Sequence, residues 1–155
     1  MIKRVNKVVL TILLSIFFSL SPAIADTLKI THAYIPDAPP MVKVMAAYMT
    51  IENTSNKAVT VFSFDSPVFG KIEIHETTMK DGMMGMDQLP EIEIPAKSKV
   101  KLKPGGKHLM LFARKRDLKL NDKLSITLHS TQGKYKIPIT VKQMAGDDSH
   151  QHMHH

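Results

Sequence analysis

Apolar residues alternate with polar ones through many short segments of this chain, and Gly, Pro, Asn or Asp bounds most of the segments. In the segment 44–53, for example, one side of an extended chain would carry Met45, Ala47, Met49 and Ile51. We find no segment with a sustained 3.6-residue period and no internal repeat. The pattern predicts an all-β fold, an antiparallel sandwich or barrel of short strands, in a single domain.

The same alternation predicts the inward-facing positions of the other strands. These positions are Leu28, Ile30, His32 and Tyr34; Ile72 and Ile74; Ile92 and Ile94; Val100 and Leu102; Leu124, Ile126 and Leu128; and Tyr135, Ile137, Ile139 and Val141. The apolar side changes between Val61 and Phe62, which predicts a β-bulge there. Pro138 cannot donate to a ladder, so its strand should be at an edge or carry a bulge.

Residues 1–25 are typical of a secretory signal peptide. Three basic residues precede an uncharged run of 13 residues, 8–20, and Ala23-Ile24-Ala25 follows it. The run is shorter than the roughly 20 residues that a membrane-spanning helix needs, so we expect no stable membrane insertion after cleavage. The prediction is a periplasmic protein whose mature domain covers 26–144.

The composition excludes several classes of function. The chain has no cysteine, so an exported protein of this kind has no disulfide, no thiol redox chemistry and no thiolate metal ligand. The formal net charge of +7 falls to +4 without the three basic residues of the leader. No basic cluster is interleaved with aromatic residues, and we therefore expect no binding of nucleic acid.

Methionine and histidine supply the candidate metal ligands. His108 and Met110 are two residues apart in a predicted strand, so both would point to one face while Leu109 and Leu111 point to the other. His75 has the opposite parity from the core positions Ile72 and Ile74. Soon after it comes the segment 79–86, in which Asp-Gly forms a turn and several thioethers lie nearby.

Two imidazoles with thioethers and no carboxylate form a soft donor set, which favours Cu(I) over Zn, Mg, Ca or Mn. Neither ligand type has to lose a proton above about pH 6.5, so such a site should bind at neutral pH. Methionine is more often a core residue than a ligand, and we assign Met45 and Met49 to packing. We expect His32 and His129 not to be ligands.

The spacing of these residues resembles a known family. His75, ten intervening residues, Met86, twenty-one intervening residues, and then His108-Leu109-Met110 match the motif of the periplasmic copper chaperones called PCu(A)C. The blocks 74–79, 92–96 and 102–110 are similar to that family as well, and the similarity extends from about Leu28 to Val141.

This resemblance implies a cupredoxin-like barrel that holds Cu(I) with His75, Met86, His108 and Met110. It also implies a chaperone that delivers copper to an acceptor, either subunit II of cytochrome c oxidase during CuA centre assembly or another assembly factor. We expect a monomer. The alternative is copper sequestration for tolerance, which would use the same ligands without a dedicated acceptor.

Other functional classes have less support in the residues. A blue-copper electron carrier needs a cysteine thiolate, which this chain lacks. The chain has no G-x-S-x-G or H-E-x-x-H motif and no nucleophile with an adjacent base. Glu76 follows His75 directly, so on a strand it would point to the other face. We therefore expect that the protein is not an enzyme.

The last eleven residues, 145–155, contain no aliphatic residue suited to a core, and we expect a flexible tail. It carries a second set of candidate ligands, which are His150, His152, Met153, His154 and His155. One hypothesis is a secondary Cu(II) site in this tail, and the alternative is an inert segment or a cloning remnant.

Overall fold

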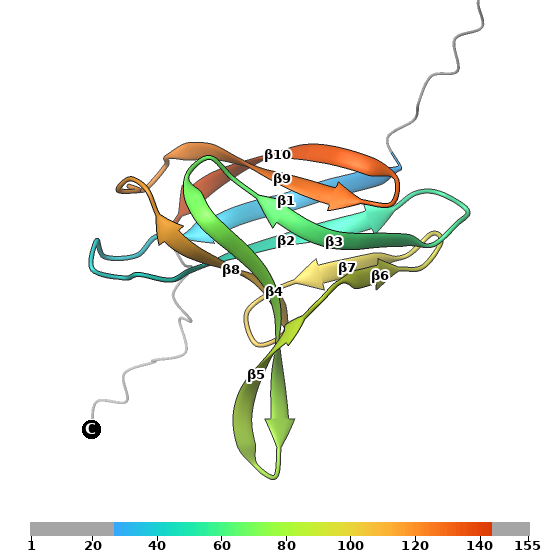
Figure 1. Ribbon diagram of the computed structural model, residues 1–155, viewed down its shortest axis with the longest axis horizontal. Helices are drawn as coiled ribbons and strands as arrows, with labels where there is room; N and C mark the ends of the chain where they lie inside the picture. Colours follow the sequence, from blue (N-terminus) through green and yellow to red (C-terminus); the bar gives the residue numbers. More distant parts are fainter. Residues whose placement is uncertain (1–26, 144–155) are drawn as a thin grey trace, which may run out of the picture.

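The computed structural model describes residues 27–143, which form ten strands and no helix (Figure 1). The predicted leader and the predicted tail lie outside the described residues. The strands are β1 (Leu28–Pro36), β2 (Met45–Asn53), β3 (Val59–Asp65), β4 (Phe69–Lys80), β5 (Met83–Leu89), β6 (Ile92–Ile94), β7 (Lys99–Leu102), β8 (Lys107–Arg114), β9 (Lys123–Ser130) and β10 (Gly133–Lys142).

The strands pair in the order β5-β4-β8-β2-β1-β10-β9-β3-β6, and β7 pairs with β2 off this path. Strand β2 lies beside both β8 and β7. Its first residues pair with β8, and its later residues pair with β7. The predicted antiparallel pairing is confirmed for every neighbouring pair except β1 and β10. These two strands run parallel where 34–36 meets 140–142.

The core lies between the inward faces of these strands. On β2, the predicted residues Met45, Ala47, Met49 and Ile51 are all buried, and the residues between them are partly exposed. Leu109 and Leu111 on β8 are fully buried, as their alternation predicted. Full burial of one such aliphatic side chain stabilises the fold by about 1.5–3 kcal/mol. The all-β prediction and most of the predicted core positions are confirmed.

The predicted alternation is wrong in the second half of β1. His32 has a φ of 54° and is exposed, and the register with β2 shifts between Thr31 and Tyr34. A residue in the left-handed region inserts a β-bulge, which reverses the parity of the residues after it. Ile35 therefore takes the buried position, and Tyr34 is only partly buried.

Two predicted irregularities are confirmed. The register between β3 and β9 shifts between Val61 and Ser63, where the apolar side changes. Pro138 of β10 pairs with Ser125 of β9, whereas the ladder between β1 and β10 includes only 140–142 of β10. On its β1 side, Pro138 thus lies at a local edge, where its missing N–H costs no ladder hydrogen bond.

The hairpin of β4 and β5 projects from the rest of the molecule (Figure 1). Asp81 and Gly82 form its turn, and both have positive φ, 52° and 77°. Positive φ at both central residues is the geometry of a type I′ turn, which sets the register of the flanking strands. The sequence predicted this turn but not the strand β5 that follows it.

Candidate metal centre

His75 on β4 and His108 on β8 are direct partners across an antiparallel pair. Directly opposite residues point to the same face of a sheet. The centroids of the two imidazole rings are 6.2 Å apart, with an angle of 32° between the ring planes. The neighbouring partners Ile74 and Leu109 are buried on the core face, so the two histidines lie on the other face.

Both predicted methionine ligands lie on the face of the histidines. Glu73 is opposite Met110 on β8, and Thr77 is opposite Met86 on β5. Since each of these pairs is two residues from His75 along β4, Met110 and Met86 are diagonal neighbours of His75. Diagonal neighbours in a sheet are about 7–8 Å apart, which is within the reach of long side chains. The other three predicted ligands are thus all direct or diagonal neighbours of His75.

A turn before β8 orients the ring of His108. Pro104 and Gly105 are its central residues, Gly105 has a φ of 70°, and the Gly106 N–H donates to the Lys103 carbonyl at 3.2 Å. These are the features of a type II turn. The Gly106 carbonyl accepts a hydrogen bond from His108 Nδ1 at 2.9 Å. Because Nδ1 carries the proton, the neutral ring has its lone pair on Nε2.

The same Gly106 carbonyl accepts the backbone N–H of Thr77 at 3.2 Å. One oxygen therefore connects the turn to β4 and orients the imidazole of His108. The sequence analysis did not identify this function of Gly106, because no side-chain pattern signals a backbone acceptor.

Glu73 orients the ring of His75. Its Oε2 lies 2.9 Å from His75 Nε2, and its Oε1 pairs with Lys71 Nζ at 2.8 Å. The hydrogen bond from Lys71, followed by that from His75, lowers the pKa of Glu73 below its ordinary range. Because the Glu73 carboxylate can only accept a hydrogen bond, Nε2 of His75 carries the proton, and Nδ1 of the neutral ring carries none. Among the described residues, this buried Nδ1 has no hydrogen-bond partner.

A cavity of about 320 Å³ opens beside these residues. Its walls include Met86, His108 and Met110, but not His75, whose ring lies next to that of His108. A larger cavity of about 680 Å³ lies between β1 and β10, and none of the four predicted ligands lines it. The donor chemistry, and not the cavity size, marks the smaller one as the candidate site.

Two further residues shape the smaller cavity. Ala46 of β2 is opposite Met110, and its small side chain leaves space beside the thioether. Burial, and next the neighbouring Tyr34, raises the pKa of Tyr48. The Tyr48 hydroxyl is therefore neutral and adds no anionic oxygen to the donor set.

The exposure of the ligands differs from one side of the site to the other. His108 is 6% exposed, whereas Met86 on the projecting hairpin is 51% exposed. The site is thus closed by the sheet on the histidine side and open to solvent at Met86.

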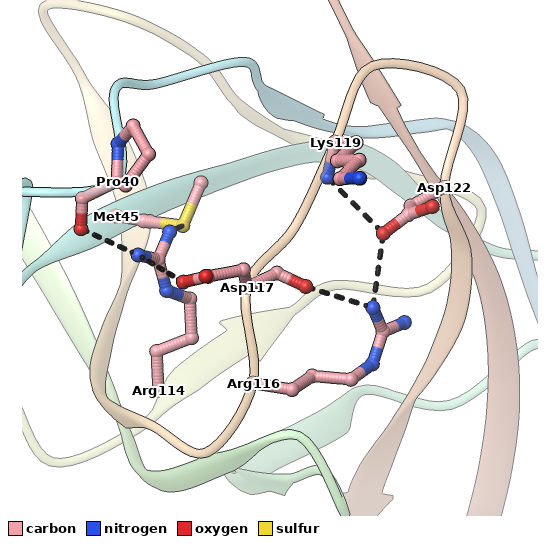
Figure 2. Close-up of polar contacts among 7 residues, drawn as sticks. All are labelled: Pro40, Met45, Arg114, Arg116, Asp117, Lys119 and Asp122. Carbon is pink, nitrogen blue, oxygen red and sulfur yellow. Dashed lines mark hydrogen bonds and ion pairs between the residues drawn. The ribbon is translucent and has the colours of Figure 1, made fainter.

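Met45 also lines the cavity, but another residue contacts its sulfur. Arg114 Nη1 lies 3.7 Å from Met45 Sδ, and Nη2 donates to the Pro40 carbonyl at 2.7 Å (Figure 2). Met45 and Met49 are both buried, which agrees with their assignment to packing.

His129, His32 and Glu76 lie away from the candidate site. His129 Nε2 pairs with Asp65, and His32 is exposed on the bulge of β1. Glu76 pairs with Lys107 at 2.6 Å, and the register places both on the face opposite the two histidines. In residues 27–143, no three His, Cys, Asp or Glu side chains are grouped so that they could hold a metal ion. The same part of the chain has no apolar helix of membrane-spanning length.

Sequence comparison identifies the family of this chain. The model of the family described as "Putative lipoprotein LpqE-like" matches residues 28–141. The chain belongs to this family. The LpqE-like match includes all four predicted ligands. Over 124 residues, the chain is 30% identical to "Putative lipoprotein Lxx21020" of Leifsonia xyli subsp. xyli. The aligned region covers 79% of this chain and 74% of the relative.

Solved structures share the fold of this LpqE-like chain. The Cu(I) form of DR1885 from Deinococcus radiodurans is 33% identical, with a TM-score of 0.61 over 79% of this chain and 85% of that one. The copper-bound PCuAC domain of PmoF2 is 19% identical, with a TM-score of 0.65 over 76% and 93%. The predicted resemblance to the PCu(A)C family and its fold is confirmed, and both of these relatives carry copper.

Proposed function

We propose that this chain is a periplasmic copper chaperone that holds one Cu(I) ion with His75, Met86, His108 and Met110. The observation that carries the proposal is the pair of imidazoles whose ring centroids lie 6.2 Å apart on one face of β4 and β8. On each of the two strands that flank β4, one diagonal neighbour of His75 is a methionine, Met86 on β5 and Met110 on β8. The copper-bound relatives support copper as the metal.

The protonation of the two rings favours binding of a cation. His75 would coordinate through Nδ1 and His108 through Nε2, because hydrogen bonds hold the proton on the other nitrogen of each ring. In the neutral form of each imidazole the coordinating nitrogen carries no proton, and thioethers carry none. The four donors are neutral and two are soft sulfurs, a set that favours Cu(I) over harder ions.

The open side of the site suits transfer of the ion. Met86 is half exposed and lies on the projecting hairpin, so an acceptor could approach this ligand first. Exchange of one neutral thioether for an acceptor ligand breaks no covalent bond in the protein. The proposed acceptor is subunit II of cytochrome c oxidase, during assembly of its CuA centre, or another assembly factor.

Copper binding is tested by competition between the mature protein and a chromophoric Cu(I) chelator. We expect one tightly bound equivalent that is lost in His75→Ala. Equal affinity of the wild type and this variant would contradict the proposed site.

Delivery and sequestration use the same ligands, so a cellular test separates them. Deletion of the gene should lower oxidase activity in low copper if the protein delivers copper. Copper sensitivity with normal oxidase activity would instead favour sequestration.

The tail ligands His150, His152, Met153, His154 and His155 lie outside the described residues, and a secondary Cu(II) site there stays a proposal. Electron paramagnetic resonance of the Cu(II)-loaded chain tests it. We expect a nitrogen-rich Cu(II) signal that disappears when the four tail histidines are replaced by alanine. Persistence of the signal would contradict the proposal.

A further inference from the structure

The projecting hairpin carries three methionines on one face. The register of β4 and β5 pairs Thr77 with Met86 and, two residues closer to the turn, Met79 with Met84. Alternation places all of these side chains on the face of His75. Met79 and Met84 are not among the four ligands of the proposed function.

Core packing does not explain these side chains. Met79 is 65% exposed and Met84 is 74% exposed, so neither fills a gap in the interior. Large apolar side chains at the tip of an isolated hairpin expose apolar surface to water without a packing gain. Their exposure leaves both thioethers accessible to a soft cation.

The opposite face of the hairpin has a different chemistry. Lys80 pairs there with Asp87 at 3.5 Å, and the Thr78 hydroxyl donates to the same carboxylate at 3.3 Å. Met83 is opposite Lys80 on this polar face and is 72% exposed. The hairpin therefore has one thioether face with three methionines and one polar face with a single methionine.

The spacing on the thioether face suits one bridging ion. Directly opposite residues have Cβ atoms about 4.5–5.5 Å apart, and each thioether sulfur lies one carbon beyond its Cβ. Two sulfurs from Met79 and Met84 can therefore converge on a single ion. Met86 is the diagonal neighbour of Met79 and follows Met84 by two residues on β5.

We infer that Met79 and Met84 form an outer site for Cu(I), adjacent to the four-ligand site and connected to it through Met86. The identity of the metal rests on the proposed function. Thioether donors select Cu(I) among the common metal ions. The outer site would hold an ion near the exposed tip of the hairpin. From there, Met86 is the next methionine on the same face toward His75.

Nuclear magnetic resonance of methionine methyl groups tests this site in the full mature chain. The probe is Cu(I) supplied as its acetonitrile complex to protein labelled at the methionine methyl carbons. We expect the first equivalent to shift the Met86 and Met110 signals. The next two equivalents should shift Met79 and Met84 together and leave Met83 in place.

Matched variants identify the ligands. Leucine conserves the volume of methionine, so Met79→Leu with Met84→Leu should leave the fold intact. In this double variant, we expect the Cu(I) that binds after the first equivalent to be held at least tenfold more weakly, as measured by chelator competition. Met83→Leu is the control and should bind like the wild type.

Two results would overturn the outer site. One is that the Met79 and Met84 signals do not move through three equivalents of Cu(I). The other is that they move equally with Met83, which would indicate unspecific contact with any exposed thioether. If the first equivalent leaves Met86 and Met110 unchanged, the four-ligand site fails instead, and the outer site is still judged from its own signals.

Discussion

His75 and His108 are direct cross-strand partners, and hydrogen bonds to Glu73 and to the Gly106 carbonyl orient their rings. The two residues are far apart in the sequence, and the pairing of β4 with β8 brings them together. Each ring has one nitrogen that holds a proton and one that does not. This arrangement is the basis of the first two predictions.

Replacing either histidine should abolish tight Cu(I) binding. His75→Ala or His108→Ala removes a direct ligand, so we expect the Cu(I) affinity to fall by more than about 100-fold, beyond the 10–100-fold typical for loss of an outer partner. Chelator competition at neutral pH measures this change. His129→Ala is the control, because His129 pairs with Asp65 away from the site. Similar losses in all three variants would show that the effect is not specific.

Removing the carboxylate of Glu73 should weaken the site without removing a ligand. In Glu73→Ala, the ring of His75 loses the acceptor that holds its proton on Nε2, and we expect Cu(I) affinity to fall about 10–100-fold. Nitrogen-detected magnetic resonance of the apoprotein should show that His75 no longer has a single tautomer. Glu76→Ala is the matched control, since Glu76 lies on the opposite face and pairs with Lys107. An unchanged His75 tautomer in Glu73→Ala would contradict the positioning function of Glu73.

Filling the cavity should exclude the metal. Ala46 is opposite Met110, and Ala46→Leu would occupy space that the thioether needs. We expect about tenfold weaker Cu(I) binding, with a melting temperature that drops only moderately because Ala46 is partly exposed. Ala58→Leu is the control, because Ala58 is exposed and does not line the cavity. Binding of wild-type strength by Ala46→Leu would mean that copper does not use this cavity.

The loop after β8 should contribute stability that depends on pH. A hydrogen bond from Arg116, at 2.9 Å, and then one from the backbone N–H of Lys119 lower the pKa of Asp122 below its ordinary value of 3.8 (Figure 2). A lowered carboxyl pKa stabilises the fold above the ordinary value, and the effect is lost as the pH falls through the folded value.

The variant Asp122→Asn tests this dependence. We expect its melting temperature to be slightly below that of the wild type at pH 7, and the difference should shrink as the pH falls below 3.8. Leu128→Ala is the control, because it removes buried apolar contacts and no charge. A difference between Asp122→Asn and the wild type that grows in acid would contradict the sign of the pKa shift.

The sequence was sufficient to predict every strand except β5, and much of the core. Met49 and Ile51, for example, alternate with polar residues and are buried as expected. The prediction failed at His32, because the bulge there depends on a left-handed backbone conformation that alternation does not reveal. The parallel contact of β1 with β10 was also missed, since it joins distant segments.

The candidate ligands were predictable in part. Alternation placed His108 and Met110 on one face, and the structure agrees. The selection of Met86 from several hairpin methionines came from the resemblance to the PCu(A)C family, because residue type alone does not distinguish them. Glu73 shares the parity of His75, but its hydrogen bond could not be predicted without the rotamers of both residues.

X-ray absorption at the copper edge tests the central claim most directly. The sample is the reduced mature protein with one equivalent of Cu(I), compared with the double variant Met86→Leu and Met110→Leu. We predict mixed nitrogen and sulfur neighbours in the wild type and loss of the sulfur contribution in the variant. A wild-type spectrum with only nitrogen or oxygen neighbours, or a sulfur contribution that the double variant retains, would contradict the site of His75, Met86, His108 and Met110.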